Sequence, residues 1–190
     1  MYCLAKNPDL QERVYSNIME HAPLSVERIG VEQVGRMEYL GAFLQEVLRL
    51  YPPVGFFPRV NRFREFLDGV EVPPGTRIAL VPHLLHRHPK YWDDPETFNP
   101  ERWLNVSEKE IERRRFAFFP FSFGGRNCIG QYFATLEAQM IVAAIVRAFR
   151  VEIAPSQKST DHTFSSKITM KSKPLVRLAV QERIAARVEI

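Results

Sequence analysis

One cysteine near the end of a glycine-rich segment carries the strongest chemical signal in this chain of 190 residues. Cys128 lies in the segment 121–130, Phe-Ser-Phe-Gly-Gly-Arg-Asn-Cys-Ile-Gly, directly before an amphipathic stretch at 131–149. The thiol is therefore predicted at or near a helix N-terminus, where unpaired backbone N–H groups and the helix dipole favour an anion. Such a position favours the thiolate, which is the form of cysteine that binds metal.

The residues around this thiol suit a flat ligand that carries negative charge. The glycines of the segment would let the backbone approach a flat, bulky group without Cβ clashes. Arg126 could pair with an anionic group on the same ligand. Cysteine thiolate is one of the few protein axial ligands of haem iron, so the segment predicts a haem site with Cys128 as the metal ligand. A simpler interpretation is that Cys128 is a small buried hydrophobic residue, as most free cysteines are.

Five positions of the segment favour the haem interpretation. Phe121, Gly124, Arg126, Cys128 and Gly130 match the haem-ligand loop of the cytochrome P-450 family, Phe-x-x-Gly-x-Arg-x-Cys-x-Gly. The segment thus resembles that loop, and the resemblance implies that these residues bind haem b (iron protoporphyrin IX). It also implies that Phe121 packs beside the porphyrin and shields the sulfur from water, which helps to set the iron's potential.

A second motif, Glu-x-x-Arg, supports the resemblance through its context. It occurs three times, as Glu46/Arg49, Glu110/Arg113 and Glu112/Arg115. Residues three apart share one helix face and can pair, so the motif alone is a weak signal. Only the first pair lies in an apolar helix that would bury its charges, and a buried pair needs further partners. The other two are predicted to be solvated pairs.

The further partner of the first pair is supplied by the segment 98–103, Phe-Asn-Pro-Glu-Arg-Trp. In the family that the chain resembles, an arginine of such a segment joins the helix pair in a structural triad behind the haem. The resemblance therefore implies a triad of Glu46, Arg49 and Arg102. Its expected role is to lock the cysteine loop so that the thiolate stays directed at the iron.

Arg59 is the remaining candidate for cofactor binding. It is predicted to lie on a strand after Pro52-Pro53, and its family counterpart contacts a haem propionate. Arg59 and Arg126 together would suit two carboxylates. For both, the interpretation as an ordinary surface residue stays open.

Three histidines, His83, His86 and His88, offer an alternative metal site, although their spacing is a weak signal. The segment 86–89, His-Arg-His-Pro, is similar to a recurrent family segment, His-Arg-Asp-Pro. His88 replaces the acidic residue of that segment, so a local contact of the aspartate is expected to be missing.

Hydrophobic periodicity predicts the elements that position these residues. We expect helices at about 8–21, 37–50 and 131–149, short helices within 84–92 and 107–115, a hairpin at 62–72, a strand at 77–81 and a β-rich tail at 167–180. The hairpin should turn at Asp68-Gly69, and Asn7 should cap the helix that follows it. The fold class is thus mainly α with small β-sheets (α+β). By resemblance, residues 1–190 form a single partial domain, the C-terminal, haem-proximal part of the cytochrome P-450 fold.

Composition excludes several other classes of protein. Two cysteines, Cys3 and Cys128, give no disulfide framework, and a bridge between them would remove the proposed ligand. The net charge of +4 comes without a recognisable nucleic-acid module, so no nucleic acid is expected. Lys109 and the run 113–115 are predicted to form a solvated basic face, which could also steer an acidic electron donor. No run of about 18 apolar residues and no signal peptide are present.

The resemblance implies a monooxygenase that inserts one oxygen atom from dioxygen into a small, lipophilic organic substrate. Electrons would come from a flavin reductase or a ferredoxin-type donor. The family's oxygen-activation helix and its N-terminal membrane anchor are expected upstream of Met1, which would give an intracellular protein at the endoplasmic reticulum membrane. The chain by itself is expected to be inactive. Two alternatives stay open: a haem-thiolate isomerase or dehydratase that needs no electron donor, and a truncated, non-catalytic haem-binding fragment.

Overall fold

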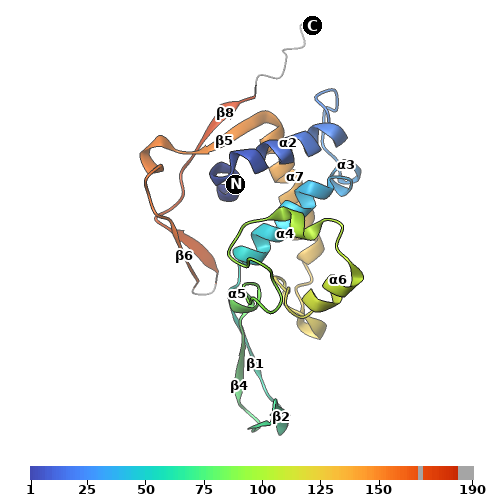
Figure 1. Ribbon diagram of the computed structural model, residues 1–190, viewed down its shortest axis with the longest axis vertical. Helices are drawn as coiled ribbons and strands as arrows, with labels where there is room; N and C mark the ends of the chain where they lie inside the picture. Colours follow the sequence, from blue (N-terminus) through green and yellow to red (C-terminus); the bar gives the residue numbers. More distant parts are fainter. Residues whose placement is uncertain (167–168, 184–190) are drawn as a thin grey trace.

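The computed structural model describes residues 1–166 and 169–183, and it combines helices with small two-stranded sheets (Figure 1). The helices are α1 Tyr2–Lys6, α2 Pro8–His21, α3 Val31–Gly35, α4 Glu38–Leu50, α5 Pro82–Leu85, α6 Glu108–Arg114 and α7 Gln131–Ala148, with 3-10 helices η1 Pro100–Trp103, η2 Gly124–Arg126 and η3 Pro155–Gln157. The predicted α+β class is confirmed. Residues 167–168 of the predicted tail and 184–190 of the predicted partial domain lie outside the described residues.

The strands pair as four antiparallel couples. They are β1 Phe57–Val60 with β4 Arg77–Leu80, β2 Glu65–Leu67 with β3 Val70–Val72, β5 Phe149–Ile153 with β8 Leu178–Glu182, and β6 Thr163–Ser166 with β7 Met170–Lys173. Within the described part of the chain, no helix is long and apolar enough to cross a membrane.

The core lies where α2, α4 and α7 pack against one another, with α4 at the centre (Figure 1). Its fully buried side chains include Val14, Ile18, Leu40, Phe43, Ala143 and Val146. The predicted bounds of α2 are confirmed, and α4 starts one residue later than predicted. Because α4 also contacts η1 on its other side, charged residues on that side of the helix are removed from water.

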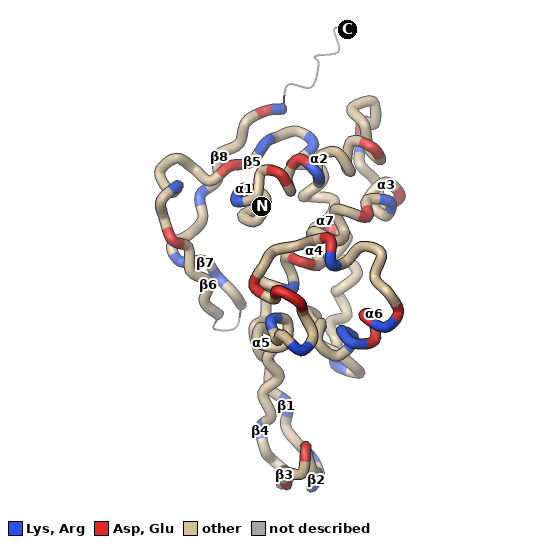
Figure 2. The backbone as a smooth tube through the Cα atoms, viewed as in Figure 1, with Lys and Arg blue, Asp and Glu red and all other residues tan. Residues whose placement is uncertain are grey.

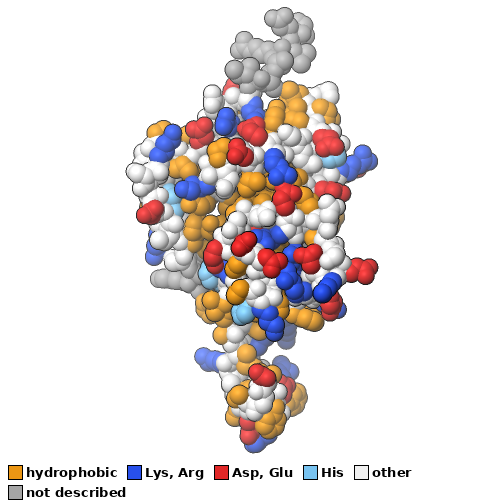
Figure 3. Space-filling view, in the orientation of Figure 1, with side chains coloured by type: hydrophobic (Ala, Val, Ile, Leu, Met, Phe, Trp, Pro, Cys, Tyr) orange, Lys and Arg blue, Asp and Glu red, His pale blue; other side chains and the backbone are white. Residues whose placement is uncertain are grey.

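The strands β1 and β4 form an arm that projects from the helices and ends in the β2–β3 hairpin (Figure 1). Asp68 and Gly69 have φ angles of 49° and 79°. Positive φ at both central residues is what a two-residue hairpin turn needs, so the predicted turn is confirmed. Apolar side chains gather at this tip (Figure 3), where Phe63 and Phe66 are exposed.

Two local predictions were wrong. The short helix expected within 84–92 is α5, which begins at Pro82 and ends at Leu85. Proline is favoured in the first turn of a helix, and Pro89 disfavours helical backbone before it. Asn7 does not cap α2 through its side chain; its Nδ2 donates instead to the Cys3 carbonyl at 2.7 Å, which satisfies the end of α1.

A buried glutamine joins the helices to the β5–β8 sheet. Gln11, on α2, is 1% exposed. Its Nε2 donates to the Val151 carbonyl at 2.8 Å and to the Leu4 carbonyl at 3.2 Å, and its Oε1 accepts from the Val151 N–H at 2.7 Å. This side chain therefore bonds both backbone groups of one residue of β5.

Replacing Gln11 by methionine should destabilise the natural protein that carries this chain by about 1–3 kcal/mol, because buried backbone groups lose their partners. Urea unfolding measures the change. Gln181→Met, at an exposed position of β8, is the matched control and should alter stability by less than about 0.5 kcal/mol. Equal losses in the two variants would show that the Gln11 amide does not hold β5.

Candidate functional site

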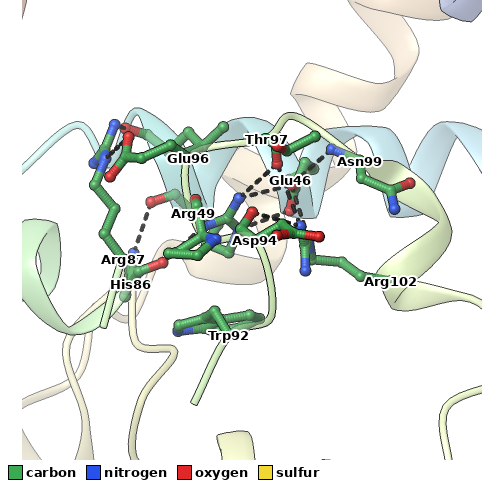
Figure 4. Close-up of polar contacts among 12 residues, drawn as sticks. Glu46, Arg49, His86, Arg87, Trp92, Asp94, Glu96, Thr97, Asn99 and Arg102 are labelled. Atoms are coloured by element: carbon green, nitrogen blue, oxygen red, sulfur yellow. Dashed lines mark hydrogen bonds and ion pairs between the residues drawn. The ribbon is translucent and has the colours of Figure 1, made fainter. Parts of the chain in front are cut away.

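Glu46 and Arg49 form a completely buried ion pair on α4 (Figure 4). The two residues lie side by side on the helix, and both side chains are 0% exposed. Arg49 Nε donates to Glu46 Oε2 and Arg49 Nη2 to Glu46 Oε1, each at 2.8 Å. The two parallel bonds give the pair a single geometry, since the planar guanidinium matches the carboxylate.

Three further groups donate to the same carboxylate. Arg102 Nε lies 3.0 Å from Glu46 Oε1, the Asn99 N–H 2.9 Å from the same atom, and Trp103 Nε1 2.9 Å from Oε2. Burial raises the pKa of Glu46, but the hydrogen bonds from Arg49 and Asn99 and the arginine charges outweigh it and hold the pKa below its usual value. Glu46 is thus kept ionised inside the protein.

The three residues predicted as a triad are therefore in contact. Arg49 also donates to the carbonyls of His86, Pro95 and Thr97, at 2.8, 2.6 and 3.2 Å. The pair thereby ties the segment 86–99 to α4. Trp103 is the partner that sequence reasoning missed, although a buried indole N–H usually needs an acceptor.

The other two Glu-x-x-Arg motifs, at 110/113 and 112/115, differ from Glu46/Arg49 in their exposure and pairing. Glu112 and Arg115 lie 3.6 Å apart and are 68% and 58% exposed, as expected for a solvated pair. Arg113 bonds Asp93 at 3.3 Å in place of Glu110. Charges of both signs lie along α6 (Figure 2).

The predicted basic face at 113–115 is wrong at its centre. Arg114 is buried, donates to the Arg102 carbonyl at 2.6 Å, and lies over the Trp92 ring at 5.2 Å. Its guanidinium is also paired with Glu110 at 2.9 Å, so it is not the free surface charge that the predicted basic face requires.

The three histidines do not form a metal site. His86 uses both ring nitrogens on backbone groups, His83 contacts Arg87, and His88 accepts from the Lys90 N–H at 3.1 Å. Among the described residues, no group of histidine, cysteine or acidic side chains could hold a metal ion. The His88 ring thus makes a turn bond of the kind that an aspartate side chain can also make.

The cysteine loop presents its thiol at the surface. Cys128 is exposed, whereas Cys3 is buried, so the interpretation of Cys128 as a core residue is wrong. The Cys128 N–H donates to the Phe121 carbonyl at 2.9 Å, which closes the loop. Gly124, with a φ of 73°, takes the left-handed conformation that glycine adopts most easily. The loop ends at Gly130, which directly precedes the first residue of α7.

The other candidate residues surround this loop. Arg59 lies on β1 and donates to Ser122 Oγ at 2.9 Å, which brings the arm against the loop. Phe121 and Gly124 line a groove of about 580 Å³ between α4, the loop and the start of α7. Arg126 and Cys128 are exposed and do not line it.

Large apolar side chains are exposed directly after the thiol. Ile129 is fully exposed, and Tyr132 and Phe133 are 76% and 66% exposed. An open thiol beside apolar side chains, with two arginines at the same loop, is a donor set that fits haem, which is flat, apolar and carries two carboxylates.

The chain belongs to the cytochrome P450 family. Residues 1–178 match the family model described as "Cytochrome P450". Cytochrome P450 4p1 of Drosophila melanogaster is 34% identical over 182 residues, which cover 95% of this chain and 34% of the relative. Cytochrome P450 4V2 of Mus musculus is 38% identical over 152 residues, covering 80% of this chain and 29% of the relative. The chain thus spans about a third of the length of these relatives.

Removing the buried carboxylate should lower the free energy of unfolding far more than removing an exposed one. Glu46→Ala leaves the Arg49 charge buried without its partner, which we expect to destabilise the natural protein by about 3–5 kcal/mol. Glu112→Ala is the matched control and should change stability by about 0–1 kcal/mol. Urea unfolding compares the two, and equal losses would refute the assignment of Glu46 as the structural carboxylate.

His86 should make the folded state sensitive to acid. Burial, together with the charges of Arg49 and Arg87, lowers the pKa of His86 from 6.5 to about 4. As the pH falls from 6.5 to 4, His86 becomes protonated in the unfolded chain but stays largely neutral in the folded protein. The free energy of unfolding therefore falls. The loss should approach about 3 kcal/mol at the low end.

Urea unfolding between pH 4 and pH 7 measures this loss. His86→Gln carries no titrating ring, so its stability should fall less over the same interval than that of the unchanged protein. Identical pH dependence in the two proteins would contradict the prediction.

Proposed function

We propose that the protein carrying this chain is a haem-thiolate monooxygenase with Cys128 as the axial ligand of the iron. One observation carries the proposal. An exposed thiol stands on a loop that is closed by the Cys128–Phe121 backbone bond and precedes α7. The family match supports the same class of protein.

Named residues of this chain would hold the haem. Arg59 and Arg126 are the candidates for the two carboxylates, because both belong to or contact the cysteine loop. Phe121, Gly124 and Gly130 would complete the loop's contact with the ring, Phe121 by keeping water from the sulfur. Arg59 would then exchange its Ser122 bond for one to a carboxylate, which is a stronger, charge-assisted bond.

When bound, the haem supplies dioxygen activation, and electron donation from a thiolate ligand favours O–O bond cleavage. The chain contributes position and environment. The Glu46–Arg49–Arg102 triad keeps the segment behind the loop in one arrangement, as its hydrogen bonds require. Exposed apolar residues such as Ile129 and Phe133 would exclude water from the ligand's surroundings.

The proposed substrate is a small, lipophilic organic molecule, and the proposed electron donor is a flavin reductase or a ferredoxin-type protein. We also propose a location at the endoplasmic reticulum membrane. The comparisons do not favour the alternative that needs no electron donor. Activity is proposed for the natural protein, since this chain spans about a third of its relatives.

The absorption spectrum of the reduced, carbon monoxide-bound protein tests the ligand. The natural protein should give the red-shifted Soret band of thiolate ligation, and Cys128→Ala should abolish it. Cys3→Ala is the matched control, because Cys3 is a buried thiol of the core, and it should keep the band. If Cys128→Ala kept the band, another residue would be the ligand and the proposal would fail.

A further inference from the structure

The ring of His86 lies between the end of α4 and the segment that leads to the cysteine loop. Its Nδ1 is 3.2 Å from the Arg49 carbonyl, and its Nε2 is 3.1 Å from the Phe119 amide nitrogen. A carbonyl can only accept and a backbone N–H can only donate. His86 must therefore be neutral, with its hydrogen on Nδ1 and a lone pair on Nε2.

Buried aromatic and polar groups enclose the His86 ring. His86 is 0% exposed and contacts the rings of Phe118 and Phe119, with centroids 5.2 and 5.5 Å away. Its own carbonyl accepts from Arg49 Nη1 at 2.8 Å. His86 and Arg49 are thus joined by two bonds, one to the guanidinium of the triad and one to its backbone.

The hydrogen bond to Phe119 connects His86 to the backbone segment that positions the Cys128 thiol. The Phe119 carbonyl accepts from the Ser122 N–H at 3.1 Å, and the neighbouring Phe121 carbonyl accepts from the Cys128 N–H at 2.9 Å. A displacement at Phe119 would therefore move the residue that closes the loop on Cys128.

We propose that His86 is a positioning residue for the haem ligand, which anchors the cysteine loop to the buried Glu46–Arg49 pair through the Phe119 N–H. The proposal rests on the proposed function, in which Cys128 ligates the iron. It assigns to the ring a directional role that a packed apolar side chain of the same size could not perform.

Two amide variants separate positioning from packing. The oxygen of His86→Gln can reach the place of Nε2 and accept from Phe119. The shorter amide of His86→Asn can replace Nδ1 and donate to the Arg49 carbonyl, but it cannot reach Phe119. Both remove the ring, so both lose the aromatic contacts with Phe118 and Phe119.

The experiment uses the natural haem-loaded protein and two measurements. Amide hydrogen exchange of residues 119–128 reports the anchoring directly, and the reduced carbon monoxide spectrum reports thiolate ligation. In His86→Asn we expect exchange roughly tenfold faster than in the unchanged protein, as the loss of one buried hydrogen bond predicts, and a weakened thiolate band. In His86→Gln both should return to within about twofold of the unchanged protein.

Equal effects of the two variants on loop exchange would overturn the proposal, because the ring would then act only by packing. Unchanged exchange in His86→Asn would overturn it as well. If His86→Asn does not fold, His86→Gln decides: it must keep both loop protection and the thiolate band. Absence of the band from the unchanged protein would refute the proposed function, while the exchange measurement would still decide whether His86 anchors the loop.

Discussion

The burial of the Glu46 carboxylate is the constraint on which the surrounding structure depends. Taking an ionised carboxylate out of water costs several kcal/mol, and this side chain is 0% exposed. Its oxygens are satisfied by donors from separate places: Arg49 on the same helix, the Asn99 backbone, and Arg102 and Trp103 of η1. Each donor must stay within hydrogen-bonding distance, so the segment 86–99 and η1 have one arrangement against α4.

Arg49 extends this constraint towards the cysteine loop. The N–H groups that it does not use on Glu46 bind carbonyls of the segment 86–99, and its own carbonyl meets the His86 ring. The polar chain runs through aromatic side chains, with Trp92 beneath the guanidinium (Figure 4) and Phe118 beside His86. The cysteine loop is therefore supported from one side while its thiol remains open. A ligand that meets such a loop needs little further ordering of the chain, which lowers the entropic cost of binding.

Sequence patterns predicted what depends on periodicity and local chemistry. The apolar spacing gave α2, α4 and α7 almost to the residue, and the Asp68-Gly69 pair gave its turn, because a helix face and a two-residue turn are local properties. The apolar context also singled out Glu46/Arg49 among three equal motifs. The charged run at 113–115 predicts a solvated Arg114, since such runs are usually solvated, whereas the approach of Trp92 and the Arg102 carbonyl explains its burial. The role of His86 required the same long-range information, since its partners lie 37 and 33 residues away.

An ion network in this position is explained by geometry more readily than by stability. Well-packed apolar residues of similar volume often stabilise a protein as well as a buried ion pair does, or better. Apolar contact has no direction, however, whereas a hydrogen bond weakens steeply when its angle changes. The two sides of α4 follow this distinction. Against α2 and α7 it presents apolar residues such as Leu40, which need only fill space. Against η1 and the segment 86–99 it presents Glu46 and Arg49, which accept a single arrangement of their partners, and this is the side that leads to the cysteine loop.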